Sequence, residues 1–284
     1  MITLPLNGKW RLHEEPLSCK GLAGLRKATE DKTGWITATV PGEVHLDLMR
    51  AGRMEEPLVS LNAKKSRWPE KRSWWYEKTF TVTADFLQQE RQQLTFDGLD
   101  LYAQIFLNGE LLGETNNAFI PHTFDVRHRL CKGKNTLVVR LTVGYEMLDK
   151  SLKAERPPRR LYGFPGRPHL RKPQFTYGWD WVDILPNIGI WRGVRLEGFS
   201  GVILRDVQVH TSIHKEKARL NISALADNLH PWSDRECTVV ITVTPPTGHV
   251  ISEQITFCAQ TGQSPFSHTI EIPNPQLWWP NGMG

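Results

Sequence analysis

Residues 101–112 carry the clearest secondary-structure pattern in the chain and read Leu101-Tyr102-Ala103-Gln104-Ile105-Phe106-Leu107-Asn108-Gly109-Glu110-Leu111-Leu112. Apolar residues occupy every second position from Leu101 to Leu107, which is the period of a β-strand with one buried face. Asn108-Gly109 follows, and both residues tolerate the positive φ angles that a two-residue type I′ turn requires. The return strand begins at Leu111. The stretch therefore predicts a β-hairpin.

The same period of two recurs on both sides of this hairpin, whereas helical periodicity is nearly absent. Alternating apolar positions before the second domain are Trp74, Tyr76, Phe80 and Val82, then Leu137, Val139, Leu141 and Val143, and then Ile190, Val194 and Leu196. Turn-forming Gly, Pro, Asn and Asp bound each run. One short helix is expected over residues 43–50, ended by Gly52 in a left-handed conformation. The pattern predicts an all-β protein with enough strands for one sandwich.

A second series of alternating segments begins after Gly198-Phe199-Ser200-Gly201. Its apolar positions are Ile203, Val207 and Val209, then Leu220, Ile222 and Ala224, then Val239, Ile241 and Val243, and finally Ile270 and Ile272. We therefore expect one domain over residues 1–199 and another over residues 200–284. The second series predicts an immunoglobulin-like β-sandwich, but it supplies fewer strands than the roughly seven of that fold. We expect this second domain to be incomplete.

Composition is that of an ordinary soluble globular protein, and its length suits about two domains. Of the 284 residues, 39% are hydrophobic and 23% are charged. No stretch approaches the roughly 18 consecutive apolar residues of a membrane span, so we expect no membrane partner. The net charge of +5 is spread along the chain rather than gathered into one run. Because no nucleic-acid-binding motif accompanies it, we expect no nucleic-acid partner either.

Two features bear on the cellular compartment. The N-terminal residues 1–10 have no basic region followed by an apolar core, so they do not form a signal peptide and a cytoplasmic location is expected. The four cysteines, Cys19, Cys131, Cys237 and Cys258, are too few and too scattered for a disulfide framework. Free thiols are the favoured interpretation, and a bridge between Cys237 and Cys258 is the alternative. The sequence carries no indication of oligomeric state.

An irregular stretch over residues 155–187 interrupts the first series of strands and is rich in Pro, Gly, Arg and aromatic residues. A structureless loop of this length inside a compact domain is uncommon and usually functional. The chain also has 11 tryptophans, a side chain that stacks on sugar rings as well as filling β-sandwich cores. This stretch is where we expect the chemistry of the protein.

Within that stretch stands Arg171-Lys172-Pro173-Gln174-Phe175-Thr176-Tyr177-Gly178-Trp179-Asp180-Trp181, followed by Gly189-Ile190-Trp191-Arg192. It resembles the signature segment in the sugar-binding domain of β-mannosidases of glycoside hydrolase family 2. Further collinear matches are Leu6-Asn7-Gly8-Lys9-Trp10, Val40-Pro41-Gly42, Trp74-Trp75-Tyr76, Phe96-Asp97-Gly98-Leu99-Asp100, Leu107-Asn108-Gly109, Asn116-Asn117-Ala118-Phe119 and Leu277-Trp278-Trp279-Pro280-Asn281-Gly282. One departure is Val182-Asp183, where the family usually has Gly-Pro.

The resemblance implies a multidomain enzyme that removes a terminal β-linked mannose with retention of configuration. Its first domain would be a jelly-roll, galactose-binding-like β-sandwich, followed by the immunoglobulin-like domain and then a catalytic barrel. Retention requires two carboxyl groups about 5 Å apart, and the family carries both as glutamates on the barrel. No barrel is found in this sequence, so no catalytic residue is assigned and the barrel domain is an expected partner.

The resemblance also implies that the loop around Asp180 closes one side of a pocket for mannosides or manno-oligosaccharides. Asp180 is the candidate acceptor for sugar hydroxyl groups, since charge-assisted hydrogen bonds are about twice as strong as neutral ones. Trp179 and Trp181 are candidates for the pocket wall. Further candidate substrate-binding residues are Gln174, Arg171 and Asn117. For Gln174 a loop-bracing role is favoured, for Arg171 and Lys172 a role in holding the loop, and for Asn117 a role in a turn.

Other functions remain open at this level. A free-standing carbohydrate-binding module would use the same loop as a stacking platform, and a related β-galactosidase or β-glucuronidase would share the fold. The 10 histidines show no metal-ligand spacing, and no Gly-rich phosphate-binding loop is found. We therefore expect neither a metal site nor a cofactor.

Overall fold

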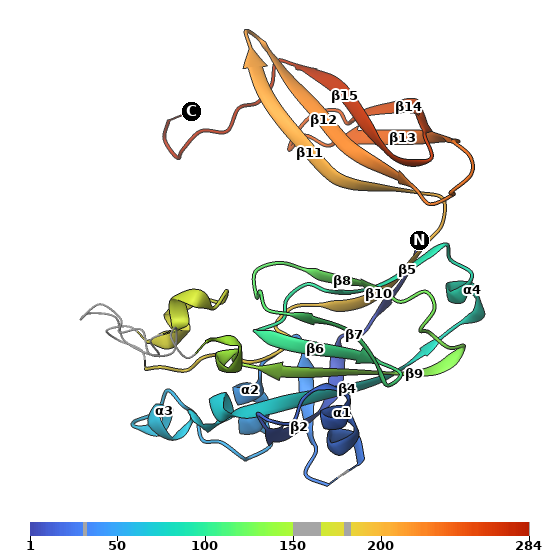
Figure 1. The fold of residues 1–284 in the computed structure, drawn as a ribbon. Helices are drawn as coiled ribbons and strands as arrows, with labels where there is room; N and C mark the ends of the chain where they lie inside the picture. Colours follow the sequence, from blue (N-terminus) through green and yellow to red (C-terminus); the bar gives the residue numbers. More distant parts are fainter. Residues whose placement is uncertain (31–32, 150–165, 179–182, 284) are drawn as a thin grey trace. The chain divides into compact units, whose positions relative to one another are not determined.

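The computed structural model describes residues 1–30, 33–149, 166–178 and 183–283 (Figure 1). These residues form two compact units, Met1–Gly198 and Phe199–Gly284. The sequence placed the boundary after residue 199. Both units are built from antiparallel strands, which confirms the predicted all-β class. No helix among the described residues is long and apolar enough to cross a membrane.

The first unit is a jelly-roll sandwich of two sheets, as predicted (Figure 1). The larger sheet has the strand order β3-β2-β4-β9-β6-β7, and the smaller one has the order β1-β10-β5-β8. The strands of the larger sheet are β2 (Gly8–Pro16), β3 (Ile36–Val40), β4 (Arg72–Val82), β6 (Tyr102–Leu107), β7 (Glu110–Thr115) and β9 (Gly133–Thr142). Those of the smaller sheet are β1 (Ile2–Pro5), β5 (Arg91–Phe96), β8 (His122–Asp125) and β10 (Val194–Phe199).

The main core lies between these two sheets and holds the apolar positions that alternate in the sequence. Trp74, Tyr76, Leu137 and Leu141 of the larger sheet and Phe96 of the smaller sheet are all buried in it. The β6–β7 hairpin turns at Asn108 and Gly109, whose φ angles are 51° and 88°. The hairpin predicted from residues 101–112 is therefore confirmed.

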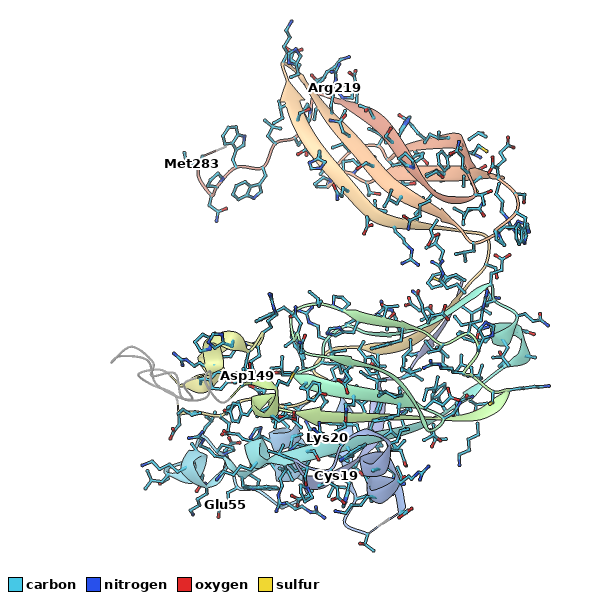
Figure 2. All side chains as sticks on the ribbon, in the orientation of Figure 1. Cys19, Lys20, Glu55, Asp149, Arg219 and Met283 are labelled. Carbon is cyan, nitrogen blue, oxygen red and sulfur yellow. The ribbon has the colours of Figure 1, made fainter. Side chains whose placement is uncertain are left out.

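Short helices cover parts of this unit, and the sequence predicted only one of them. They are α1 (Gly21–Glu30), α2 (Val44–Arg50), α3 (Asn62–Lys65), α4 (Ala84–Leu87), η1 (Trp68–Lys71), η2 (Tyr145–Met147), η3 (Arg167–His169) and η4 (Gln174–Tyr177). Helix α2 is the one expected over residues 43–50. Helix α1 was not expected; it follows Cys19 and Lys20 directly (Figure 2) and packs Leu25 and Ala28 against Trp75 on the outer face of the larger sheet.

The second unit is the smaller sandwich that the sequence predicted. Its sheets have the orders β11-β12-β15 and β13-β14. The strands are β11 (Val202–His214), β12 (Lys217–Asn228), β13 (Arg235–Val243), β14 (Ile251–Ala259) and β15 (Gly262–Pro273). Over the described residues 199–283 these strands are fewer than the roughly seven of an immunoglobulin domain, and the incompleteness of the domain stays a prediction.

The cysteines settle the disulfide alternative within the second unit. In the β13–β14 pairing, Cys237 lies opposite Phe257 and Cys258 lies opposite Glu236. Cys237 and Cys258 are therefore not directly opposite each other on the two paired strands. All four cysteines are free, so the favoured prediction is confirmed and the alternative bridge between Cys237 and Cys258 is wrong.

Candidate functional site

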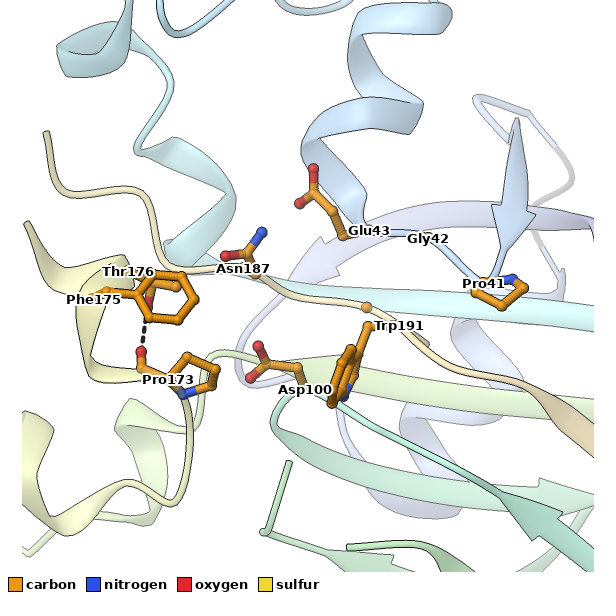
Figure 3. Close-up of a pocket in the computed structure, with 10 residues that line it drawn as sticks. Pro41, Gly42, Glu43, Asp100, Pro173, Phe175, Thr176, Asn187 and Trp191 are labelled. Atoms are coloured by element: carbon orange, nitrogen blue, oxygen red, sulfur yellow. Dashed lines mark hydrogen bonds between the residues drawn. The ribbon is translucent and has the colours of Figure 1, made fainter. Parts of the chain in front are cut away.

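A pocket of about 340 Å³ opens in the first unit beside the segment that resembles the family signature. Three parts of the chain line it: the turn before α2, the connection between β5 and β6, and described residues of the segments 173–176 and 187–191. The lining residues are Pro41, Gly42, Glu43, Asp100, Pro173, Phe175, Thr176, Asn187, Gly189 and Trp191. Figure 3 shows Pro173 and Phe175 on one side, Trp191 on the other, and the Asp100 carboxylate between them.

Trp191 forms one wall and is held in place by its surroundings. Its indole nitrogen donates a hydrogen bond to the Ala118 carbonyl at 3.2 Å, and the Arg192 guanidinium carbon lies 4.2 Å from the ring centroid. A Cβ atom at Gly98 would come within 2.5 Å of the indole nitrogen, so only glycine fits beneath the ring. Trp191 is 38% exposed and Phe175 is 70% exposed, which leaves aromatic surface at the mouth of the pocket.

The described part of the signature loop, which we define as residues 171–187, is braced by its own polar groups. The Gln174 amide donates to the carbonyls of Arg167, Leu170 and Lys172 at 3.1–3.3 Å. The Thr176 hydroxyl donates to the Pro173 carbonyl at 2.8 Å, the dashed bond in Figure 3. The Leu185 amide donates to the Thr176 carbonyl at 2.9 Å. These bonds give an irregular segment a defined backbone course.

A buried ion pair lies behind the pocket. The Lys172 ammonium is 2.9 Å from Asp100 Oδ1, with the two side chains 0% and 7% exposed. It also donates to the Asn187 carbonyl at 2.6 Å. Burial lowers the pKa of Lys172 and raises the pKa of Asp100, and the opposite charge of each partner limits both changes.

The start of α2 forms the opposite rim of the pocket. Glu43 is the N-cap, and its carboxylate accepts hydrogen bonds from the backbone amides of His45 and Leu46 at 3.1 and 2.9 Å. The same carboxylate lies 2.8 Å from His45 Nδ1. One turn later, burial raises the pKa of Asp47 to about 6. Thus Glu43 reaches the pocket, but its carboxylate is occupied in capping the N-terminus of the helix.

The sequence-predicted site residues fall into two groups. Asp180, Trp179 and Trp181 lie outside the described residues, so their proposed contacts with sugar stay predictions. Asn117 and Arg171 lie side by side in an isolated parallel bridge, and Arg171 lines a second hollow of about 230 Å³ that also holds Asn116.

The side chains of the described candidates already have protein partners. The Asn117 side chain accepts a hydrogen bond from the Phe119 amide at 3.0 Å, as expected of Asn in a turn. Gln174 donates to three loop carbonyls, and Lys172 holds the loop. The Asp100, Glu43 and Trp191 side chains were missed as site residues. Asp100 and Trp191 belong to the motifs quoted from the sequence. A single sequence does not show which residues of such motifs line the same pocket.

The described groups at this pocket are suited to binding. Glu43 caps α2 and Asp100 pairs with Lys172, so neither carboxylate is free to act as nucleophile or general acid. Among the residues that the structure describes, no three His, Cys, Asp or Glu side chains cluster in a way that could hold a metal ion. What remains is a concave surface with aromatic walls and a few polar groups, which suits a small polar ligand.

The model of the glycosyl hydrolase 2 galactose-binding domain-like family matches residues 24–192, which include the whole pocket lining. The chain belongs to this family. The chain is similar to β-mannosidase B of Emericella nidulans, which is 32% identical over 260 residues, 88% of this chain and 29% of that protein. β-Mannosidase B of Aspergillus terreus is 30% identical over 265 residues, 91% of this chain and 30% of that protein.

Solved structures extend the family likeness to the whole chain. The β-D-mannosidase of Dictyoglomus thermophilum matches with a TM-score of 0.83 and 32% identity, covering 100% of this chain and 33% of that one. The exo-chitosanase CsxA of Amycolatopsis orientalis matches with a TM-score of 0.65 and 19% identity, covering 100% of this chain and 30% of that one, a likeness of fold alone. The chain spans about a third of the length of these relatives.

Proposed function

We propose that this chain is the N-terminal, non-catalytic portion of a retaining β-mannosidase that removes terminal β-D-mannose from oligosaccharides. The observation that carries this proposal is the match of the entire chain to a β-D-mannosidase at 32% identity, in fold as well as in sequence. The collinear motifs quoted above support the same assignment. Its partner in this proposal is the catalytic barrel, which belongs to the remaining two thirds of such an enzyme.

The signature loop is the part of the chain that we assign to the mannose pocket. Supporting this, its described residues form one side of the 340 Å³ pocket, with aromatic surface at the mouth. Asp180, between Pro173 and Asn187 in the sequence, is the proposed acceptor for sugar hydroxyl groups. Trp179 and Trp181 are the proposed walls. Arg171, Gln174 and Asn117 support the loop in this proposal rather than contact the sugar.

A hydrolysis assay with a chromogenic β-mannoside tests the non-catalytic part of the proposal. A retaining mechanism needs two free carboxyl groups about 5 Å apart, and the carboxylates at the pocket are engaged elsewhere. We expect no turnover by the purified chain above the uncatalysed background. Turnover that persists through purification controls would show that the chain has its own catalytic pair.

Calorimetry with mannose and manno-oligosaccharides tests the binding part. One side of a pocket makes only part of the contacts of the whole, so we expect dissociation constants in the millimolar range, about 4 kcal/mol of binding free energy. A submicromolar constant would instead identify a free-standing carbohydrate-binding module. Absence of any binding to a correctly folded chain would contradict the proposed contribution to the pocket.

A further inference from the structure

Lys172 is buried at the beginning of the signature loop and contacts the end of that loop. Its ammonium donates to the carbonyl of Asn187, fifteen residues later, at 2.6 Å. The same ammonium lies 2.9 Å from Asp100, which belongs to the connection between β5 and β6. One charged group therefore joins both ends of the loop to each other and to the sandwich.

Asp100 is fixed independently by its backbone. Its amide donates to the Gly189 carbonyl at 2.9 Å, and its carbonyl accepts from the Gly189 amide at 2.8 Å. The chain leaving the loop therefore runs beside Asp100. At the entry, the Ala118 amide donates to the Arg171 carbonyl at 2.9 Å. The ion pair therefore lies next to three segments: the start of the loop, its end, and the connection between β5 and β6.

Stability alone does not explain a buried pair of this kind. Removing two charges from water is expensive, and replacing such a pair with apolar side chains of similar size is often neutral or stabilising. An apolar pair, however, offers no donor to the Asn187 carbonyl and no directional contact between the two ends of the loop. The contribution of Lys172 and Asp100 is therefore to hold the two ends of the loop in a defined geometry, not to increase the free energy of unfolding.

We propose that Lys172 and Asp100 are positioning residues that fix the two ends of the signature loop, so that its pocket-lining residues Pro173, Phe175 and Asn187 meet the sugar in one arrangement. The reference to sugar rests on the proposed function. The fixing of the loop ends does not, and it is measurable without any ligand. Lys172 is fully buried and acts through the loop, and the role that this proposal gives to Asp100, which also lines the pocket, is to hold Lys172.

The main test is the double variant Asp100→Leu/Lys172→Met, studied by hydrogen–deuterium exchange and thermal unfolding. We expect its melting temperature to stay within a few degrees, about the range of near-neutral replacements. Exchange at the Leu185 and Gly189 amides is expected to rise at least about tenfold through local opening. Amides of β4 and β9 should keep their wild-type rates. Unchanged exchange at Leu185 and Gly189 would overturn the proposal.

Lys78→Met is the matched control. The Lys78 ammonium also donates to two backbone carbonyls, those of Asn7 and Lys9 at 3.3 and 2.8 Å, but these bonds are solvent-exposed and Lys78 is far along the chain from the loop. This variant should leave exchange at Leu185 and Gly189 as in the wild type. A comparable rise there would show that loss of any such lysine loosens the loop, and would also overturn the proposal.

Asp100→Asn keeps the test decisive if the double variant does not fold, since it preserves size and removes one charge. Without its partner the charged ammonium is disfavoured in this buried position, which weakens its contact with the Asn187 carbonyl. Raising the pH through the pKa of Lys172 removes the charge and should restore protection at the end of the loop. We expect protection of Gly189, corrected for intrinsic exchange, to increase with pH in this variant and not in the wild type. Equal protection at every pH would contradict the proposal. If the wild type binds no mannoside, the proposed function fails while these exchange results still stand.

Discussion

Gly189 lies between the end of the signature loop and the turn before α2, and there is no room for a side chain there. An added Cβ would be 2.5 Å from the Gly42 carbonyl oxygen and 2.7 Å from the Glu43 Cα, both backbone atoms. Backbone atoms move only with their whole segment. We expect Gly189→Ala to lower the free energy of unfolding by about 1–3 kcal/mol, measured by urea denaturation.

Gly193→Ala is the control for this prediction, four residues further along. Its nearest neighbour would be the tip of the Asp97 carboxylate at 3.0 Å, which can rotate away. We expect a change below about 1 kcal/mol, because surface groups adjust at little cost. Equal losses in both variants would mean that the tight contact between Gly189 and the turn is not what makes glycine necessary.

Asp47 is expected to make the free energy of unfolding fall as the pH rises, which is the opposite of the usual effect of a carboxyl group. Burial raises its pKa from 3.8 to about 6, against the opposing hydrogen bond from the Thr39 amide and the charge of Arg50. Between these values the folded state binds more protons than the unfolded state, so stability falls as the pH rises from about 4 to about 6. The Asp47→Asn variant should lose that decline, a difference on the order of 2 kcal/mol. The check is denaturation of both proteins across this range; parallel curves would contradict the raised pKa.

Among the elements, α2 shows how one residue serves both helix and pocket. The Glu43 carboxylate accepts from the amides of His45 and Leu46 and lines the pocket. Burial alone would raise its pKa, but the hydrogen bonds and charge of His45 lower it overall. We expect Glu43→Ala to lower the free energy of unfolding by about 1 kcal/mol at pH 7. Because a lowered carboxyl pKa stabilises only above the unfolded value, the difference should shrink as the pH falls below about 4. A loss that is the same at pH 3 and pH 7 would exclude the ionised cap.

In two elements that the sequence failed to predict, tertiary contacts interrupt the regular spacing of apolar residues. Helix α1 carries only a narrow apolar stripe, since it covers Trp75 with Leu25 and Ala28. Strand β14 was missed because Glu253 occupies an inward position, where it meets His268 of β15 at 2.6 Å. The β6–β7 hairpin was predictable because its pattern and its turn residues are local.

At the scale of the whole molecule, the sequence predicted the all-β class and the sandwich type, because alternation and turn residues recur through the chain. It also directed attention to the loop after Leu170. The family resemblance implied a pocket at this loop, but the sequence did not predict the lining of the observed pocket, which joins the turn before α2, Asp100 and the loop across long sequence separations. Nor did it predict the pairing of Lys172 with Asp100, since two charges far apart in sequence show no common period.

We propose above all that Asp180 of the signature loop accepts hydrogen bonds from the hydroxyl groups of a mannose. The most direct measurement is a titration of the chain with methyl β-mannoside, followed by NMR, for the wild type, Asp180→Asn and Asp183→Asn. Asp183 is the matched control because it lies in the same loop, and its carboxylate caps the Ile184 amide at 2.9 Å. We expect weak binding by the wild type and by Asp183→Asn, and at least about tenfold weaker binding by Asp180→Asn, as the loss of charge-assisted hydrogen bonds implies. Equal affinities of the wild type and Asp180→Asn would contradict the claim.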